Sequence, residues 1–253
     1  MKKVLLQGRK MMKVFSQDPS RTKVLNEVNV DIYENDFTII MGSSGAGKST
    51  LLYTLSGMDA LTEGTVAYKG EEISRFSEKQ MAKIRAEQFG FVFQQAHLVS
   101  NLTVFENVTV AGYVSKRGSS GEVQEQARLL LSQMGIEKAE DRLPHQISGG
   151  EAQRAAIARA MIGSPGLLFA DEPTGALNRA HTEEVLSLLT SLNKSGQSIL
   201  MATHDLRAAA RGNRILYLED GKILEELMLP RYEPAYERVR ENKLRDWLAE
   251  LQW

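Results

Sequence analysis

The stretch GSSGAGKS at residues 42–49 directly follows the apolar run FTIIM at residues 37–41. Its spacing matches G-x-x-x-x-G-K-[ST], the phosphate-binding loop that joins a strand to a helix. We therefore predict a buried strand over residues 37–41 and a helix over residues 48–55. The backbone N–H groups of such a loop surround a polyphosphate, and glycines are needed because side chains would block its approach. The stretch predicts a nucleotide-binding site, in which Lys48 reaches the β- and γ-phosphates and Ser49 ligates Mg²⁺.

A second apolar run, LLFA at residues 167–170, ends in two adjacent carboxylates, Asp171 and Glu172. A parallel strand that is buried on both faces is a continuous apolar run, and ligand sites lie at its carboxyl end. Asp171 suits a water-mediated contact with Mg²⁺, and Glu172 suits a base that orients an attacking water. An isolated Asp-Glu pair is more often a polar strand end that starts a turn, but a nucleotide hydrolase needs this second element.

The stretch HQISGGEAQR at residues 145–154 predicts a helix that begins with small residues. Ser148, Gly149 and Gly150 would leave backbone N–H groups unblocked at a helix N-terminus, which makes a second anion site. Taken alone, Ser-Gly-Gly is a common turn at the start of a helix. A second anion site in a chain that already has a phosphate loop makes sense if it contacts the nucleotide of another copy.

Short apolar runs alternate with helical patterns along the rest of the chain, which is typical of a mainly parallel α/β sheet. Further strands are predicted at residues 64–70, 89–93, 198–202 and 215–218, and a helix at residues 77–87. From about residue 104 to residue 161 the pattern is helical, and the stretch GSSG at residues 118–121 within it has the composition of a linker. One apolar helical stripe there consists of Val123, Ala127, Leu130, Leu131 and Met134.

The composition is that of an ordinary globular protein, with 253 residues, of which 42% are apolar and 25% charged. The formal net charge of −1 gives no electrostatic footprint for nucleic acid. The chain has no cysteine, which excludes a disulfide framework, a thiolate metal site and a cysteine nucleophile. Because neither a signal-peptide core nor a run of 18 apolar residues occurs, we expect a soluble, cytosolic protein.

Taken together, the motifs resemble the ATP-binding cassette (ABC) ATPases over about residues 4–227. In chain order, the matching positions are the aromatic stacker Phe15, the phosphate loop at residues 42–50, the glutamine-loop residue Gln94, the signature ISGGE at residues 147–151, the acidic pair Asp171 and Glu172, the D-loop GALN at residues 175–178, and the switch histidine His204. The resemblance implies an α/β fold with a P-loop NTPase (RecA-like) core. That core has a mainly parallel sheet, an antiparallel β subdomain and an inserted helical subdomain.

The resemblance also implies a homodimer that holds two ATP molecules, each between Lys48 of one copy and residues 148–150 of the other. The implied ATP-binding residues are Phe15, Gly42, Ser43, Ser44, Gly45, Ala46, Gly47, Lys48, Ser49, Thr50, Ser148, Gly149, Gly150 and Glu151. The implied catalytic residues are Glu172, His204, Lys48 and Gln94, and the implied Mg²⁺ ligands are Ser49, Gln94 and Asp171.

Two of these positions depart from the family pattern. The family usually has Tyr where this chain has Phe15, so an ordinary core phenylalanine is the alternative there. The family D-loop generally ends in Asp, whereas this chain has Asn178. Asn lacks the charge but can still cap the helix that follows.

The stretches at residues 91–108 and 172–178 resemble the bacterial branch of lipoprotein-release, macrolide-efflux and antimicrobial-peptide-resistance ATPases. This resemblance implies a separate integral membrane permease, which the ATPase drives from the cytoplasmic face of the membrane to export or extract an amphipathic substrate. A mechanotransmitting ABC ATPase of the cell-division type is one alternative. A soluble ABC ATPase that acts on DNA or ribosomes is another, although the charge balance and the lack of a long coiled-coil insertion count against it.

The predicted organisation is a nucleotide-binding domain over residues 1–228, with the helical subdomain at about residues 95–160, and a C-terminal helical extension over residues 229–253. The extension can place six side chains on one helical face, namely Tyr236, Val239, Leu244, Trp247, Leu248 and Leu251. Packing on its own domain is the simpler role for this helix. Docking of Trp247, Leu248 and Leu251 on the second copy or on the permease is the alternative.

Overall fold

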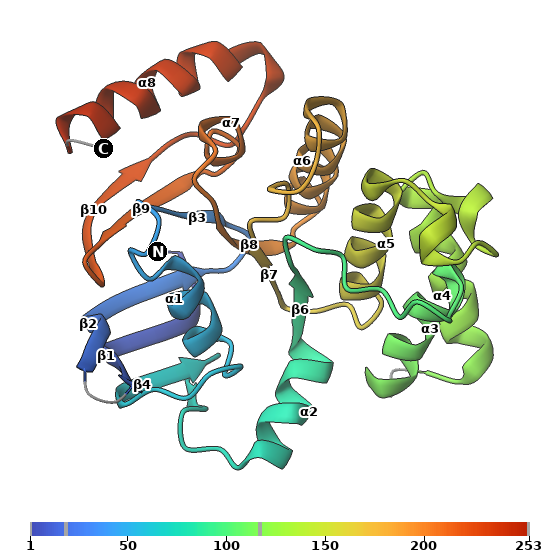
Figure 1. Ribbon diagram of the computed structural model, residues 1–253, viewed down its shortest axis with the longest axis horizontal. Helices are drawn as coiled ribbons and strands as arrows, with labels where there is room; N and C mark the ends of the chain where they lie inside the picture. Colours follow the sequence, from blue (N-terminus) through green and yellow to red (C-terminus); the bar gives the residue numbers. More distant parts are fainter. Residues whose placement is uncertain (1, 18–19, 116–117, 252–253) are drawn as a thin grey trace. The chain divides into compact units, whose positions relative to one another are not determined.

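Figure 1 shows the computed structural model, which describes residues 2–17, 20–115 and 118–251. Residues 252 and 253 of the predicted C-terminal extension lie outside this range. The chain divides into two compact units. Unit 1 consists of Met1–Ser77 and Gly196–Trp253, and unit 2 consists of Glu78–Ser195.

Unit 1 contains an antiparallel sheet in the order β2-β1-β4-β5. Its strands are β1 (Val4–Gln17), β2 (Ser20–Tyr33), β4 (Glu63–Tyr68) and β5 (Glu71–Glu72). Alternate side chains of a strand point to opposite faces, and in β2 Val28, Val30 and Ile32 are accordingly buried. The expected antiparallel subdomain is confirmed by this sheet.

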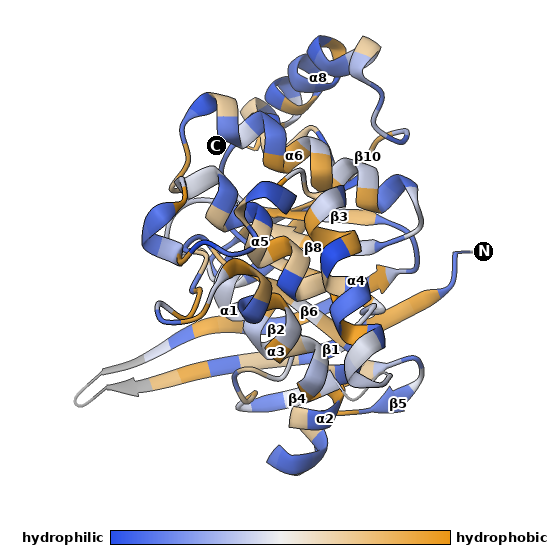
Figure 2. Ribbon diagram, turned by 90° about the vertical axis from the view of Figure 1, so that its right-hand side faces the viewer, coloured by the Kyte–Doolittle hydropathy of each residue, from blue (hydrophilic) through white to orange (hydrophobic). Residues whose placement is uncertain are grey.

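Unit 1 also contains the strands β10-β9-β3-β8, which lie side by side in that order. They are β3 (Phe37–Met41), β8 (Ser198–Ala202), β9 (Arg214–Glu219) and β10 (Lys222–Met228). β3 runs parallel to both β8 and β9, while β10 is antiparallel to β9. Every residue of β3 and β8 is buried, as the predicted continuous apolar runs require. Figure 2 shows hydrophobic colours along these two strands.

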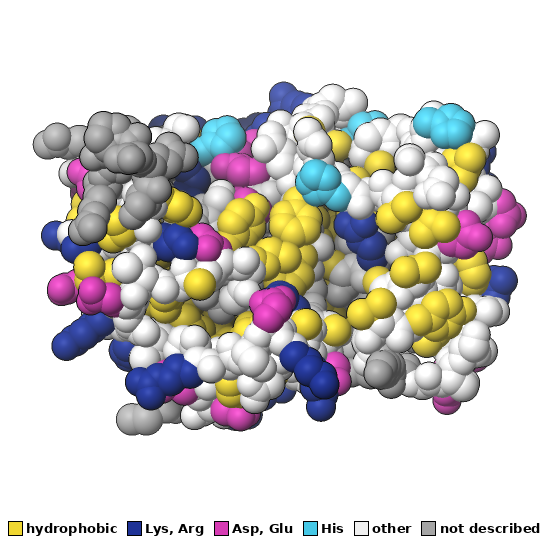
Figure 3. Space-filling model, turned by 60° about the horizontal axis from the view of Figure 1, so that its bottom comes forward, with side chains coloured by type: hydrophobic (Ala, Val, Ile, Leu, Met, Phe, Trp, Pro, Cys, Tyr) yellow, Lys and Arg dark blue, Asp and Glu magenta, His cyan; other side chains and the backbone are white. Residues whose placement is uncertain are grey.

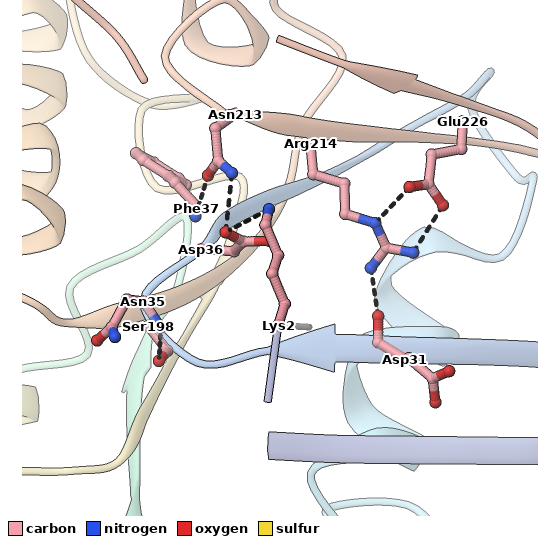
Figure 4. Close-up of polar contacts among 9 residues, drawn as sticks. All are labelled: Lys2, Asp31, Asn35, Asp36, Phe37, Ser198, Asn213, Arg214 and Glu226. Carbon is pink, nitrogen blue, oxygen red and sulfur yellow. Dashed lines mark hydrogen bonds and ion pairs between the residues drawn. The ribbon is translucent and has the colours of Figure 1, made fainter. Parts of the chain in front are cut away.

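Two sets of polar contacts stabilise the strands of unit 1, one at the start of β3 and the other between β9, β10 and β2 (Figure 4). The carboxylate of Asp36 accepts hydrogen bonds from Lys2 Nζ and from Asn213 Nδ2, at 2.9 Å each to Oδ1. The guanidinium of buried Arg214 makes a bidentate pair with Glu226, at 2.8 and 2.7 Å, and also donates to the carbonyl of Asp31. These bonds tie β9 to β10 and to β2, because Asp31 lies in β2.

The described part of unit 1 contains the α-helices α1 (Lys48–Leu55), α7 (Leu206–Ala209) and α8 (Glu237–Glu250) and a 3-10 helix at Pro234–Tyr236. α8 follows Pro230 as the sequence predicts, but its buried face differs from the predicted one. Arg240, Leu244 and Leu248 are buried at four-residue spacing, whereas Val239 is 65% exposed and Tyr236 is also exposed. The predicted stripe is therefore wrong at its first two positions. The stripe that contacts the rest of unit 1 begins at a buried arginine.

Unit 2 contains the parallel pair β6 (Phe89–Val92) and β7 (Leu167–Asp171). Its helices are α2 (Glu78–Gln88), α3 (Val104–Ser115), α4 (Ser120–Gln133), α5 (Gly149–Met161) and α6 (Arg179–Lys194). The predicted stripe on α4 is confirmed, since all five of its side chains are buried. The interpretation of residues 118–121 as a linker is wrong, because Ser119 caps α4 in a capping box with Glu122.

None of the described helices is both long and apolar enough to cross a bilayer.

Candidate functional site

The predicted phosphate loop lies between β3 and α1 in unit 1. Gly47 precedes α1 with φ of 101°, and a Cβ atom there would lie 2.9 Å from the carbonyl oxygen of Val24. Both the backbone angle and the close approach therefore require glycine. No capping side chain covers the N-terminus of α1, which is the end of a helix that favours an anion. The local geometry is that of a phosphate-binding loop.

The middle of the loop is exposed to solvent, and both of its ends are buried. Ser43, Ser44 and Gly45 are exposed, whereas Ala46 and Gly47 are buried. Lys48 Nζ lies 2.9 Å from the carbonyl oxygen of Gly42 and 2.9 Å from that of Ser43. The ammonium group is thus held across the loop, where it can contact phosphates.

The register of the parallel strands in unit 1 places His204 beside this loop. β3 and β8 are parallel neighbours with Ile40 opposite Ala202, and the N–H of Thr203 donates to the carbonyl of Ile40 at 3.1 Å. Gly42 lies two residues after Ile40, and His204 lies two residues after Ala202. Because the carboxyl ends of parallel strands meet at one edge, the exposed His204 and the phosphate loop share that edge.

Phe15 lies in the β1–β2 hairpin of unit 1 and is 39% exposed. The ring is therefore not an ordinary core side chain, and that alternative is wrong. Lys13 Nζ lies 4.8 Å from the ring centroid and also donates to Asp59 and to the carbonyl of Ala60. An exposed aromatic face with an anchored ammonium group beside it can stack on a nucleobase.

In unit 2, Gln94 and the acidic pair follow neighbouring parallel strands. Val92 of β6 is opposite Ala170 of β7, so Gln94 and Glu172 each lie two residues beyond a paired position. Gln94 also contacts the D-loop, because a Cβ atom on Gly175 would lie 2.9 Å from Gln94 Nε2. Glu172 adopts φ of 46°, an uncommon angle for a residue other than glycine. Such strained conformations are frequent at functional sites.

The signature residues form the N-terminus of α5 in unit 2. Ser148 is the N-cap and forms a capping box with Glu151: its N–H donates to Glu151 Oε2 at 2.8 Å, and its Oγ accepts from the N–H of Glu151 at 3.2 Å. The bond from the Ser148 N–H, and a second one from Ser148 Oγ to the same Oε2 atom at 2.8 Å, lower the pKa of the Glu151 carboxyl below its ordinary value. The N–H of Ser148 is therefore used by Glu151, and of the two glycines that follow, Gly149 is exposed whereas Gly150 is buried.

α5 also holds the backbone on both sides of Gln94, through two residues that sequence reasoning missed. Gln153 is 2% exposed and its Nε2 donates to the carbonyl of Phe93 at 2.8 Å. Arg159 donates to the carbonyls of Ala96 and His97 at 2.7 and 2.6 Å. The sequence indicates the role of Gln153 only by placing a polar residue in the middle of a buried helix face.

The D-loop residues lie against the signature in the same unit. Asn178 caps α6, since its Oδ1 accepts from the N–H of His181 at 3.0 Å, which confirms the predicted cap. The His181 ring lies directly on Gly150, where a Cβ atom would be only 2.6 Å from the ring. Glu184 joins His181 to Arg154 of α5. α5 and α6 are therefore coupled next to the signature.

The predicted Mg²⁺ ligands offer a hydroxyl on Ser49 in unit 1 and, within unit 2, a carboxylate on Asp171 and an amide oxygen on Gln94. Hard oxygen donors of this kind suit Mg²⁺. Among the described residues, no three His, Cys, Asp or Glu side chains cluster so as to hold a metal ion by themselves. The residues fit an ion that arrives with the phosphates of a nucleotide.

A strand–loop–helix phosphate site with an acidic strand end defines a P-loop nucleotide hydrolase. The family model described as "ABC transporter" matches residues 25–175. An uncharacterized ABC transporter ATP-binding protein of Methanocaldococcus jannaschii is 39% identical over 221 residues, which make up 87% of this chain and 98% of that protein. This chain belongs to the ABC transporter family. It has the ABC ATPase fold, binds ATP and hydrolyses it.

Two further similarities bear on its function. The macrolide export ATP-binding/permease protein MacB of Pasteurella multocida is 36% identical over 226 residues, so this chain covers 35% of MacB. The dimeric ATP-binding cassette MJ0796, in a post-hydrolysis state with ADP and Pi bound, is 35% identical with a TM-score of 0.83. That match covers 90% of this chain and 100% of the cassette.

Proposed function

We propose that this protein is the ATP-hydrolysing subunit of an exporter, which dimerises around two ATP molecules and drives a separate membrane permease. The observation that carries the proposal is the presence of two glycine-rich helix N-termini in one chain, at α1 and at α5. One nucleotide needs one phosphate loop, so the second N-terminus serves the nucleotide of another copy. The similarity to the dimeric cassette MJ0796 supports this arrangement.

In the proposed reaction, Lys48 contacts the β- and γ-phosphates. Ser49 and Gln94 would hold Mg²⁺ with their oxygen atoms, and Asp171 would hold it through a water molecule. The bound ion would neutralise charge on the phosphates. Glu172 accepts a proton from the attacking water, and His204 contacts the γ-phosphate. The N–H groups of Gly149 and Gly150 of the second copy complete the site.

The variant Glu172→Gln tests this reaction. It keeps the size of the side chain and one acceptor oxygen but removes the base, so it should bind ATP, form a stable dimer and lose about 10² to 10⁴ in hydrolysis rate. Light scattering with and without ATP measures the dimer, and phosphate release measures the rate. Glu125→Gln, an exposed glutamate on α4, is the control and should behave as wild type. Full hydrolysis by E172Q would refute the assignment of Glu172.

The proposed permease contact lies on the helical part of unit 2. Val110, Tyr113 and Val114 are exposed on α3 at spacings of three and four residues, which places them on one helical face. Figure 3 shows exposed hydrophobic side chains among charged ones on the face it views. An apolar face on a helix of this unit suits the apolar surface of a membrane protein's cytoplasmic loop.

The partner and substrate class are proposed from the resemblance to the MacB branch. We expect a permease that exports or extracts an amphipathic substrate, such as an antimicrobial peptide or a lipoprotein, with this subunit on the cytoplasmic face of the membrane. Purification of the tagged chain from detergent-solubilised native membranes should recover a polytopic membrane protein with a large extracellular domain. Val110→Ser combined with Val114→Ser should abolish that recovery, whereas Leu129→Ser, an equally exposed residue on α4, should not. Recovery of ribosomes or DNA instead would overturn the exporter proposal, and a wall-hydrolase activator would favour mechanotransmission.

A further inference from the structure

We propose that Arg240 of α8 is a positioning residue for His204, and that the C-terminal helix thereby takes part in ATP hydrolysis. Arg240 holds the short segment that follows the histidine, so that His204 keeps the place from which it contacts the γ-phosphate. This inference rests on the proposed function, because it takes His204 to be the residue that senses that phosphate.

Arg240 is 5% exposed and uses all three of its nitrogens on backbone carbonyls. Its Nε lies 2.8 Å from the oxygen of Ala210, its Nη2 2.5 Å from that of Gly212, and its Nη1 2.6 Å from that of Pro230. A guanidinium is a rigid planar fork of donors, so three such bonds fix the relative positions of the carbonyls. Lysine has the same charge but cannot reproduce this geometry.

Two of the three carbonyls that Arg240 binds, those of Ala210 and Gly212, belong to the segment that begins at His204. Asp205 caps α7, with its Oδ1 accepting from the N–H of Arg207 at 2.7 Å, and Ala210 and Gly212 directly follow that helix. A four-residue helix has no stability of its own, and its last carbonyls lack partners within the helix. Arg240 supplies donors to the carbonyls that follow it.

Both ends of this segment are bonded to β3, the strand that leads into the phosphate loop. At the first end, the N–H of Thr203 donates to the carbonyl of Ile40. At the second end, the N–H of Asn213 donates to the carbonyl of Phe37 at 3.0 Å, and its Oδ1 accepts from the N–H of Phe37 at 2.6 Å. Arg240 holds the part between these anchors. The segment is therefore fixed at three places, one of which depends on α8.

α8 itself packs firmly on the strands of unit 1, which it must do in order to hold the segment after His204 in place. Leu244 and Leu248 are fully buried, and the indole of Trp247 makes an edge contact with Tyr217 of β9 and donates to Glu225 of β10 at 3.1 Å. A second contact joins α8 to the same segment, because Arg211 lies 3.3 Å from the carboxylate of Glu237.

Burying an arginine at the first position of this stripe carries a cost in stability that an apolar residue would not. Removing a guanidinium from water is costly, and an apolar side chain of similar volume often stabilises a protein as well or better. The stripe continues with two leucines, so an apolar residue would be the ordinary choice at position 240. The arginine occurs where two carbonyls of the segment after the switch histidine, those of Ala210 and Gly212, and the carbonyl of Pro230 accept its hydrogen bonds.

The experiment compares Arg240→Lys and Arg240→Ala with Arg238→Ala, an exposed arginine two residues away on the same helix. Amide hydrogen exchange of the purified full chain, read over residues 204–212, measures how firmly the segment is held. Steady-state hydrolysis gives kcat and KM for ATP. We expect faster exchange confined to this segment in both Arg240 variants. We also expect kcat to fall by about ten- to a hundredfold, as for a misplaced catalytic group, with KM changed by less than about threefold. R238A should match wild type.

Three outcomes would overturn the inference. These are unchanged exchange over residues 204–212 in R240K, faster exchange spread evenly over the whole chain, and a kcat within about twofold of that of R238A. The variant His204→Ala separates this inference from the proposed function. If H204A hydrolyses ATP as wild type does, the role of His204 fails, whereas the exchange result still reports on the contact made by Arg240.

Discussion

The side-chain amide of Gln153 donates a hydrogen bond of 2.8 Å to the carbonyl oxygen of Phe93, the residue before Gln94. This bond links the signature helix α5 to the glutamine loop inside unit 2. A shift of α5 would therefore move the backbone that carries Gln94. The contact offers a direct route by which events at the signature reach Gln94, the proposed Mg²⁺ ligand.

We predict that Gln153→Ala slows hydrolysis about tenfold, because Gln94 loses a fixed backbone anchor. It should also lower the free energy of unfolding by about 1–3 kcal/mol, since the buried carbonyl of Phe93 loses its donor. Phosphate release and denaturant unfolding measure the two effects. Gln126→Ala on α4 is the control. Reduced stability with an unchanged rate would limit Gln153 to a structural role.

Phe15 should contribute to nucleotide affinity through its exposed ring. Replacement by Ala removes a stacking contact of about 0.5–1.5 kcal/mol, so the Kd for ATP should rise by up to about tenfold. Phe15→Tyr restores the residue usual in the family and should leave the Kd within about twofold of wild type. Isothermal titration with ATP measures both, with Tyr236→Ala as an exposed aromatic control in the same unit. An unchanged Kd in F15A would show that the base binds elsewhere.

Asn178 should contribute to stability as the N-cap of α6. Asn178→Ala removes the acceptor for the N–H of His181 and should lower the free energy of unfolding by about 0.5–2 kcal/mol. Asn178→Asp keeps an acceptor of the same length and should retain the stability. Chemical denaturation gives the values, and Arg179→Ala, the first residue of the helix, serves as the comparison. Equal stability of N178A and wild type would contradict the capping role.

The contribution of the signature capping box to the free energy of unfolding should decrease at low pH. Hydrogen bonds from Ser148 lower the pKa of Glu151 in the folded state. The ionised carboxylate therefore stabilises the fold at pH values above the ordinary pKa of a glutamate, about 4.3. That stabilisation is lost as the pH falls through the lowered folded pKa. The difference in unfolding free energy between wild type and Glu151→Ala should therefore be constant from about pH 7 to pH 5 and shrink below about pH 4.3. A difference that grows on acidification would contradict this sign.

Local sequence patterns were enough to predict the helices and strands whose structure depends only on neighbouring residues. The apolar runs predicted β3 and β8 at their observed residues, and the phosphate-loop motif predicted α1 over residues 48–55. Glycines, a continuous apolar run and a capping residue act within a few positions of one another. For the same reason, Asn178 could be predicted to cap α6. The resemblance to ABC ATPases then supplied the order of the motifs.

The long β1–β2 hairpin was predicted only as part of an expected subdomain. Its register shifts near Met11 and Lys13 break the alternation of apolar and polar side chains on which strand prediction depends. The burial of α8 shows the same limit. A helical wheel favoured Tyr236 and Val239, yet the buried stripe starts at Arg240, because three distant carbonyls accept its hydrogen bonds.

The sequence by itself determined the chemistry of this protein: a phosphate loop, an acidic strand end and a signature helix, each set by residues close together in the chain. Only the tertiary structure decided how those parts are supported. Gln153 reaches Phe93 across 60 residues of sequence, and Arg240 reaches Ala210 across 30. A hydrogen bond between residues so far apart leaves no periodic pattern in the sequence, because it depends on where the packed core places each backbone carbonyl.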